Sequence, residues 1–281
     1  SERGETRMTA ITPNEKIGFV GAGNIAEALI RGLIAAGVAQ AKQIFAADVS
    51  AARVEAVRSR YKVHASTDNV RTAQQCHVVV LAVKPQIAEG VCREIGKGIT
   101  NHQLVVSVVA GVTTGQIHEW LGGRGRIVRV MTNTPAVVLA GASAVAPGPG
   151  VTERDIRLVE TMFGAVGDVV ALDEQDLDAV TGLSGSGPAF VCLAVEALAD
   201  GGVKAGLTRE IAMRLAVQTV LGTALLMKEG KEHPGVLKDK VASPAGTTIA
   251  GLHELEKGRF RGLLMSAVEA ATRRSRELGR R

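Results

Sequence analysis

A glycine-rich turn near the N-terminus has the residue types that bind a dinucleotide. Gly21-Ala22-Gly23 follows the apolar run Ile17 to Val20 and precedes a helical stretch that begins at Asn24. In such turns the glycines allow a tight bend and a close approach of the pyrophosphate, while the helix N-terminus attracts the anion. Asp48 follows about 22 residues after Ala26, where these folds place the acid that binds a ribose. We therefore predict dinucleotide binding, because a purely structural turn leaves the acid unexplained.

The residues around this acid leave the choice of cofactor open. The carboxylate of Asp48 can bind the ribose 2′-hydroxyl of NAD and repels the 2′-phosphate of NADP. Ser50 and Arg53 favour NADP, since a hydroxyl and a guanidinium one helical turn apart can hold a phosphate. Either side chain can instead be a helix cap or a solvated group. We expect NADPH to be accepted, with NADH as a competing cofactor.

Two further segments could bind an anionic substrate. Lys84 comes directly before Pro85, a residue that favours the first turn of a helix. Because a helix N-terminus disfavours positive charge, Lys84 either meets a ligand oxygen or simply faces solvent. Ser243 to Ile249 opens another helix, whose backbone N–H groups and hydroxyls can hold a carboxylate. A plain Ser/Thr helix cap would use the same residues, so both alternatives remain open.

Three other features have weaker signals. Asn133-Thr134-Pro135 follows an expected strand, at the sheet edge where open α/β folds bind ligands, although on its own it is also a turn. Gly182 to Ala189 places small residues before a long helix, which we interpret as a helix cap with close helix packing rather than a substrate contact. The six histidines are scattered, without metal or triad spacing. We expect them to be structural or surface groups and expect no metal site.

The elements that must position these residues alternate between strands and helices from Lys16 to about Val170. Strands are expected over residues 17–20, 43–47, 77–82, 104–109 and 127–131, with short ones over 143–146 and 166–172. Helices are expected over residues 24–36, 50–60, 85–95 and 113–121. This alternation is typical of crossover units in a parallel sheet.

Helical spacing replaces the strand pattern after Asp173. Apolar residues at three- and four-residue steps predict two long helices from near Ser186 and Arg209, and a last one over residues 259–278. Their apolar faces are too broad for the rest of the chain to cover, which predicts a homodimer with an intertwined helical domain. The fold class is α/β, a Rossmann-like nucleotide-binding domain followed by an all-helical dimerisation domain. We expect a flexible lead-in over 1–15, a dinucleotide-binding domain over 16–173 and a helical substrate-binding and dimerisation domain over 174–281.

The composition narrows the class of protein. The chain has 281 residues with a net charge of +5, enough for two moderate domains. Its basic residues are scattered and only 2% of residues are aromatic, so we expect no nucleic-acid partner. No apolar run approaches the roughly 18 residues of a membrane span, and residues 1–15 lack the apolar core of a secretory signal. Three widely spaced cysteines support neither disulfides nor a zinc site. We expect a cytoplasmic protein with a small-molecule substrate and no membrane partner.

Taken in order, these segments resemble the pyrroline-5-carboxylate reductase family, which makes proline. The resemblance covers the chain from about Lys16 to Leu278. Its motifs are Val20 to Asn24, Ala82 to Pro85, Ala110 to Val112, Met131 to Pro135, Gly182 to Ala189, His233 to Gly235 and Ser243 to Ile249. The resemblance implies reduction of the cyclic imine 1-pyrroline-5-carboxylate to L-proline with NADPH or NADH. It also implies a helical domain that interleaves with that of a partner, with dimers stacked into a larger ring such as a decamer.

The resemblance implies a role for each matched residue. The pyrophosphate would contact Val20, Gly21, Ala22, Gly23, Asn24 and Ile25. The ribose end would be read by Asp48, Ser50 and Arg53. The rest of the cofactor cleft would be lined by Asn69, Ala82, Val83, Lys84, Pro85, Ala110, Gly111 and Asn133. The substrate carboxylate would be held by the loop that contains Ser243, Gly246, Thr247 and Thr248, and Lys84 would also bind the substrate. The catalytic residue would be Thr248, through a contact with the ring nitrogen.

The sequence departs from the family pattern at two positions, and two other classes of protein remain as alternatives. Ala245 stands where the family commonly has glycine, which would strain the loop if that residue needs a positive φ. Thr132 replaces a proline found in many members. A 3-hydroxyacid dehydrogenase is one rival, but its lysine-bearing catalytic helix has no counterpart in residues 210–230. A non-catalytic NADP-binding sensor is the other, and it would need no carboxylate cradle such as residues 243–248.

Overall fold

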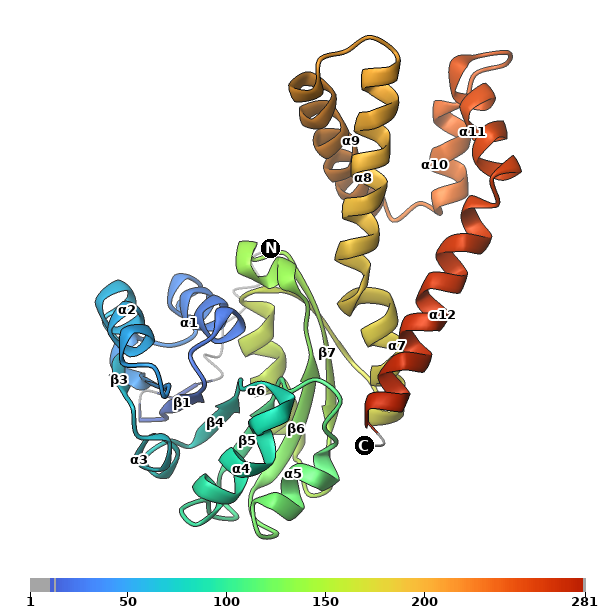
Figure 1. Ribbon diagram of the computed structural model, residues 1–281. Coiled ribbons are helices and arrows are strands. Elements are labelled where there is room, and N and C mark those ends of the chain that lie inside the picture. The colour runs from blue at the N-terminus through green and yellow to red at the C-terminus, as the bar shows by residue number, and fades with distance from the viewer. Residues whose placement is uncertain (1–10, 13, 280–281) are drawn as a thin grey trace, which may run out of the picture. The chain divides into compact units, whose positions relative to one another are not determined.

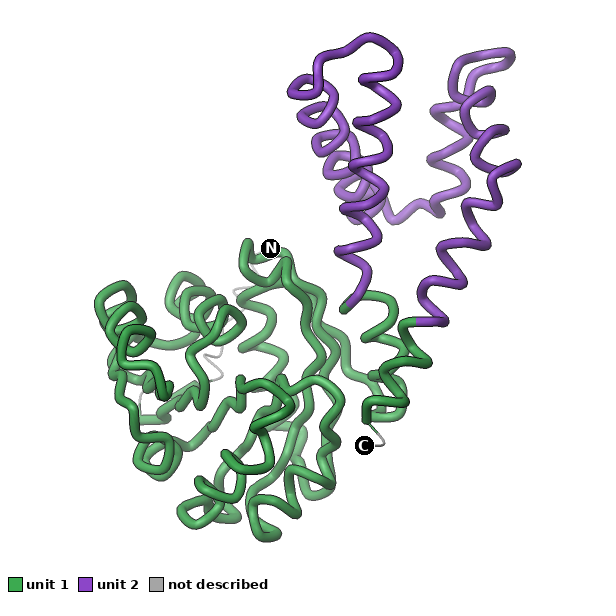
Figure 2. Tube along the Cα trace, in the orientation of Figure 1, with its two compact units in different colours: residues 1–185, 271–281 green, residues 186–270 purple. Residues whose placement is uncertain are grey.

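The computed structural model describes residues 11–12 and 14–279, so most of the expected lead-in lies outside the described residues. The chain forms two compact units (Figure 2). One runs up to residue 185 and takes up residues from 271 onwards, and the other comprises residues 186–270. We describe each unit by itself. The domain boundary expected from the sequence, at residue 173, differs from the boundary between these two units, and it remains a proposal.

The first unit is built on one eight-stranded sheet with strand order β3-β2-β1-β4-β5-β6-β7-β8 (Figure 1). The strands are β1 Ile17–Val20, β2 Ile44–Ala47, β3 His64–Ser66, β4 Val78–Leu81, β5 Leu104–Ser107, β6 Arg126–Met131, β7 Gly141–Pro147 and β8 Gly167–Ala171. All neighbouring strands are parallel except β6 and β7, which are antiparallel. Parallel strands from β3 to β6 therefore present their carboxyl ends at one edge of the sheet.

Helices cover both faces of this sheet, because alternate residues of its central strands point to opposite sides. In β4, Val78 and Val80 belong to one buried cluster and Val79 and Leu81 to another. The α-helices of this unit are α1 Asn24–Ala35, α2 Ala51–Tyr61, α3 Asn69–Gln74, α4 Pro85–Gly96, α5 Thr114–Trp120, α6 Glu153–Gly164 and α7 Leu177–Val180. Residues of α1 and α6 pack in the first cluster, and residues of α4 and α5 pack in the second. This doubly covered sheet confirms the α/β, Rossmann-like class.

Short helices complete the first unit. They are η1 Ala41–Gln43, η2 Thr134–Val138, η3 Glu174–Asp176 and the π-helix η4 Thr181–Gly185. Of the helix cap and close packing expected for Gly182 to Ala189, the N-cap position at Ser186 with Pro188 in the first turn is present, and the side-chain cap is not formed. The segment is already helical before Ser186, and Ser186 lies at the N-cap of the next helix without a side-chain capping bond. A Cβ at Gly185 would lie 2.6 Å from the terminal methyl of Met131, so the small residue allows close packing here.

The second unit consists of helices whose apolar surface is largely uncovered. They are α8 Gly187–Lys204, α9 Arg209–Gly230, α10 Pro234–Val241, α11 Thr247–Lys257 and the greater part of α12 Phe260–Gly279. The α8 and α9 helices pack side by side around only three buried alanines, Ala199, Ala212 and Ala216. Large apolar side chains elsewhere on these helices are exposed, among them Leu193 at 67% and Leu215 at 53%. A single copy therefore leaves an apolar surface that another surface must cover.

One expectation from the sequence needs correction at this point. Two helical segments, residues 174–204 and 209–230, are long and apolar enough to cross a membrane by length and composition, with mean hydropathies of 1.4 and 1.3. Neither segment is a continuous apolar run, because small and polar residues interrupt the apolar ones. Only 11% of the most apolar 18-residue window in each segment is buried within the chain. The same property fits helices that pack against a partner, so length and hydropathy do not distinguish the two environments.

The last turns of α12 belong to the first unit. The Ser275 hydroxyl donates a hydrogen bond to the Asp178 carboxylate at 2.6 Å, and Ser275 is buried. Gly279 lies against the loop after β5, where an added Cβ would come 3.3 Å from the carbonyl oxygen of Gly111. The chain therefore leaves the first unit after residue 185 and returns to it near residue 271.

Candidate functional site

The glycine-rich turn after β1 has the geometry of an anion cradle. Gly21 has φ +93°, and a Cβ there would lie 2.4 Å from the carbonyl oxygen of Ala82. Only glycine fits at residue 21 without moving the backbone at Ala82, directly after β4. Gly23 caps α1 without a side-chain hydrogen bond, and a Cβ on it would meet nothing within 4 Å. The first N–H groups of α1 are thus open to a phosphate within the described part of the chain.

Asp48 supports this turn directly. One of its carboxylate oxygens accepts a hydrogen bond from the backbone N–H of Ala22 at 2.9 Å, and the other accepts one from the N–H of Ser50 at 2.9 Å. Asp48 is half-buried at the carboxyl end of β2. The carboxylate therefore joins the glycine turn to the start of α2. Each of its oxygens keeps a lone pair that a ribose hydroxyl could use.

Ser50 is the N-cap of α2, and its hydroxyl accepts a hydrogen bond from the N–H of Arg53 at 3.3 Å. The Arg53 guanidinium is held by two groups of the neighbouring segment. Its Nε donates to the carbonyl of Ala22, and its Nη2 lies 2.5 Å from the Glu27 carboxylate. Ser50 therefore caps α2, and Arg53 forms an ion pair with Glu27. Phosphate binding by Ser50 and Arg53 stays a prediction.

Glu27 lies in the first turn of α1 and was not singled out from the sequence. It accepts hydrogen bonds from Arg53, from Arg60 at 2.9 Å and from the Tyr61 hydroxyl at 2.9 Å. Burial alone would raise the pKa of Glu27, but the bonds from Tyr61 and Arg60 and the charge of Arg53 hold that pKa below its ordinary value. Glu27 is therefore a carboxylate across the physiological pH range. No local motif marked it, because its three donors come from residues more than 25 positions away.

The loops that follow the other parallel strands begin at the same edge of the sheet. Ala82 extends the β4 ladder, its N–H donating to the Val20 carbonyl at 2.8 Å, and Lys84 is the exposed N-cap of α4. Asn69 is buried in the first turn of α3, and its amide lies 3.5 Å from the Glu94 carboxylate. Ala110 and Gly111 follow β5. The fold thus gathers the strand-end residues implied for the cofactor at the carboxyl edge of one sheet.

Asn133 has structural partners. Its side-chain amide donates to the Ser184 carbonyl at 3.0 Å, and its side-chain oxygen accepts from the N–H of Ala142 at 2.9 Å. These bonds fix the π-helix and the start of β7 to the end of β6. Nearby, the Ser143 hydroxyl donates to the hydroxyl of Thr132, the residue that replaces proline. A direct contact of Asn133 with a cofactor remains a prediction.

The implied substrate loop lies in the second unit as a tight turn before α11. The N–H of Gly246 donates to the Ser243 carbonyl at 3.0 Å, and Pro244 and Ala245 occupy the two central positions. Ala245 has φ +58°, so the strain expected at this residue is present. Gly246 is the N-cap of α11, with no side-chain capping bond. The Ser/Thr cap is therefore not formed, and the first N–H groups of α11 are open to a carboxylate.

The two threonines after this turn differ in their surroundings. Thr247 is exposed and Thr248 is half-buried, both within the first turn of α11. A Cβ at Gly246 would come 2.2 Å from the Ser243 hydroxyl, so the glycine leaves that hydroxyl its position. These residues lie in a different unit from the glycine-rich turn and Lys84. Their roles toward a substrate remain predictions.

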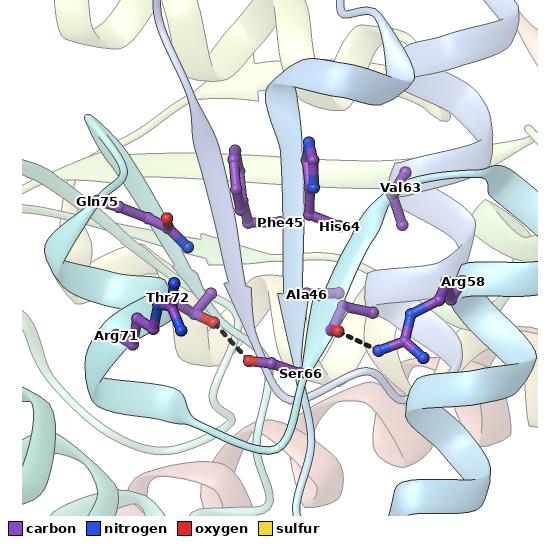
Figure 3. A pocket seen from close by; sticks show the side chains of 10 residues that line it. Phe45, Ala46, Arg58, Val63, His64, Ser66, Arg71, Thr72 and Gln75 are labelled. Carbon is purple, nitrogen blue, oxygen red and sulfur yellow. Dashed lines mark hydrogen bonds between the residues drawn. The ribbon is translucent and has the colours of Figure 1, made fainter.

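A separate pocket of about 430 Å³ lies at the β3 edge of the sheet (Figure 3). The rings of Phe45 and His64 stack there with centroids 4.5 Å apart, and Arg58 donates to the carbonyl of Ala65. Residues of α3, including Arg71, line its other side. None of the residues implied for the cofactor lines this pocket, so it is distinct from the predicted site.

Within the described residues, no group of three or more His, Cys, Asp or Glu side chains could hold a metal ion. The three cysteines are free thiols. Burial raises the pKa of Cys76 and of Cys92 to about 12, so both are neutral and poor nucleophiles. Cys192 is exposed on α8.

Comparisons with known proteins agree over nearly the whole chain. Residues 174–278 match the family described as pyrroline-5-carboxylate reductase dimerisation, and residues 16–111 match the family of coenzyme F420-dependent NADP oxidoreductases. The chain is 49% identical over 263 residues to the pyrroline-5-carboxylate reductase of Arabidopsis thaliana, across 94% of this chain and 95% of that protein.

Solved structures give the same result. The pyrroline-5-carboxylate reductase of Coxiella burnetii superposes with a TM-score of 0.90 at 38% identity, over 94% of this chain and 98% of that one. The pyrroline carboxylate reductase of Plasmodium falciparum, solved with NADP bound, superposes with a TM-score of 0.84 at 34% identity, over 95% of this chain and 98% of that one.

Proposed function

This chain belongs to the pyrroline-5-carboxylate reductase family, and from that premise we propose that it reduces 1-pyrroline-5-carboxylate to L-proline with NADPH, accepting NADH as a second cofactor. Relatives at 49% and 34% identity that match over 94% and 95% of the chain are reductases of this name, which favours imine reduction over a 3-hydroxyacid dehydrogenase or a non-catalytic sensor. The cofactor would supply a hydride to the imine carbon.

The residues of the first unit fit the cofactor in their chemistry. The tight turn at Gly21, where a Cβ would clash with the carbonyl of Ala82, and the uncapped start of α1 suit a pyrophosphate. Asp48 would meet the ribose, and Ser50 and Arg53 would meet the 2′-phosphate. Asn69, Ala82 to Pro85, Ala110, Gly111 and Asn133 would border the remaining cofactor, as proposed from the family.

The protein has a modest chemical task, because a protonated imine is already an electrophile. The uncapped start of α11, with the Ser243 and Thr247 hydroxyls, would hold the substrate carboxylate. Thr248 would hydrogen-bond the ring nitrogen and orient it, since a hydroxyl does not titrate near neutral pH. Lys84 would meet an oxygen of the substrate or the cofactor. Positioning of this kind can supply several kcal/mol of barrier lowering.

The single observation that carries this proposal is the 49% identity across 94% of the chain to a reductase of this activity. The test is an assay that follows the absorbance of reduced nicotinamide with 1-pyrroline-5-carboxylate and each cofactor in turn, with proline quantified as product. We expect proline to form in proportion to cofactor oxidised. A folded protein that oxidises neither cofactor would refute the proposal.

We further propose that the chain assembles as a homodimer through its helical unit, with dimers stacked into a higher ring such as a decamer. The uncovered apolar side chains of α8 and α9 and the match to a dimerisation family support a homo-oligomer. Light scattering should give at least twice the 29.2 kDa of one chain at micromolar concentration. A monomer under those conditions would refute the dimer, and a dimer alone would refute the ring.

Two further proposals concern location and domain division. We propose a cytoplasmic location, in keeping with three free thiols, which fractionation of the source cells would test. We also propose a boundary near residue 173 between the dinucleotide-binding domain and the helical domain. The dimerisation family begins its match at residue 174, and limited proteolysis near that residue would test the division.

A further inference from the structure

Glu27 is a half-buried acid that the proposed chemistry does not use. Its side chain is only 18% exposed, and it accepts hydrogen bonds from three side chains of α2. Two of these donors are arginines, Arg53 and Arg60, and the third is Tyr61. Such a set is more than α1 needs for its own stability, since an acid in the first turn already suits the helix dipole. We therefore ask which groups the two arginines contact besides Glu27.

Arg53 joins Glu27 to the glycine-rich turn. Its Nε donates to the Ala22 carbonyl while its Nη2 lies 2.5 Å from the Glu27 carboxylate. The Ala22 N–H in turn donates to Asp48 at 2.9 Å. The backbone of Ala22 thus connects Arg53, which is proposed for the 2′-phosphate, to Asp48, which is proposed for the ribose. In this arrangement Arg53 is committed to groups of the protein.

The charges of this network cancel. Two carboxylates, Asp48 and Glu27, stand with two guanidiniums, Arg53 and Arg60. A 2′-phosphate adds a charge of about −1.5 to −2 near neutral pH, whereas the 2′-hydroxyl of NADH adds none. A phosphate that approaches Arg53 must therefore share the guanidinium with Glu27. An unphosphorylated ribose does not meet this competition.

Building on the proposed function, we propose that Glu27 is a specificity-determining residue, which holds Arg53 against the glycine-rich turn and thereby limits the preference of the enzyme for NADPH over NADH. Glu27 touches neither cofactor in this account. It acts through Arg53, so its effect must appear as a change in the ratio of the two affinities. A merely structural acid would change both affinities together.

The test compares the Kd values of NADP⁺ and NAD⁺, measured by titration calorimetry on the full chain without substrate. Glu27→Gln keeps the shape of the side chain and removes its charge. We expect the NADP⁺ preference to rise roughly threefold to tenfold, as expected for one charge removed near a phosphate at a nearly aqueous dielectric constant. In the double variant with Arg53→Gln this rise should disappear, because the two residues act as one unit.

Arg60→Gln is the matched control. It removes the other arginine from the same carboxylate, and Arg60 is 71% exposed. Because Glu27 would then be less neutralised, the NADP⁺ preference should stay level or fall. If Glu27→Gln fails to fold, as judged by circular dichroism, Glu27→Asp serves instead, since its shorter side chain weakens the hold on Arg53 and should also raise the preference.

An unchanged or lowered NADP⁺ preference in a folded Glu27 variant would overturn the inference, as would an equal loss of both affinities. The binding ratio does not depend on imine reduction. A wild-type protein that binds both dinucleotides and forms no proline would refute the proposed function and leave this test intact.

Discussion

Ala245 offers a direct test of the strained substrate loop. Its φ of +58° lies in the left-handed region, which costs an L-residue roughly 1–2 kcal/mol. Glycine adopts this conformation without that cost, but it loses about 0.4–1 kcal/mol more entropy on folding than alanine. Ala245 is exposed, so removing its Cβ leaves no cavity. We expect Ala245→Gly to stabilise the protein by about 0.5–1 kcal/mol.

The assay is thermal unfolding followed by circular dichroism, where the gain should raise Tm by about 1–3 °C. Lys62→Gly is the matched control, because Lys62 has the same φ of +58° as the C-cap of α2 in the other unit. Both variants should gain similar stability. Only Ala245→Gly should alter the KM for the imine, because it loosens the turn at residues 243–246. The change in KM should be less than about threefold, because the hydrogen bond that closes the turn remains.

A lower Tm for Ala245→Gly beside a higher Tm for Lys62→Gly would refute the strain argument. It would mean that the alanine methyl makes contacts in the assembled protein worth more than the backbone strain. A fall in both variants would show that the left-handed cost is overestimated at these sites.

Three further expectations follow from the site and its surroundings. Thr248→Ala should lower kcat about tenfold or more if its hydrogen bond tightens in the transition state, with cofactor KM unchanged, and Thr248→Ser should restore most of the rate. Asp155 has a pKa below its ordinary value of 3.8, since the hydrogen bonds from Arg126 and from Thr152, the N-cap of α6, outweigh burial. Its stabilisation is present above that value and is lost as the pH falls through the lower folded pKa, so Asp155→Asn should flatten the drop in the urea midpoint between pH 5 and about 3. A thiol reagent at pH 8 should label at most one thiol per native chain, at Cys192, and all three after unfolding, because Cys76 and Cys92 are buried and neutral; rapid native labelling of more than one would contradict their burial.

Much of the first unit could be predicted from the sequence, because its strands are continuous apolar runs separated by turn residues. The expected strand over 17–20 matches β1, and the expected helix over 85–95 lies within α4. The edge strand β3 and the short helix α3 were missed. β3 has three residues, none of them fully buried, so it leaves no apolar pattern to detect.

The local geometry of the candidate site could be predicted where it depends on residues close in the sequence. Gly21 and Asp48 stand in fixed spacing to one strand and helix, and the resemblance to a family that commonly has glycine at residue 245 indicated the strain that the positive φ of Ala245 now shows. Glu27 was missed, because its meaning depends on Arg53, Arg60 and Tyr61 brought to it by the fold. Single-chain patterns identify backbone cradles better than side-chain networks between distant helices.

The return of α12 to the first unit has a consequence for biosynthesis. The segment from residue 271 packs with that unit, and Gly279 lies against the loop after β5. A ribosome makes all of residues 186–270 before this segment emerges from the exit tunnel. The first unit therefore cannot finish packing until residues 186–270 have been made, although all of its strands precede them in the chain. The contacts of the first unit with residues from 271 onwards form only after residues 186–270 have been synthesised, so the apolar helices are exposed in the nascent chain before the first unit has all its contacts.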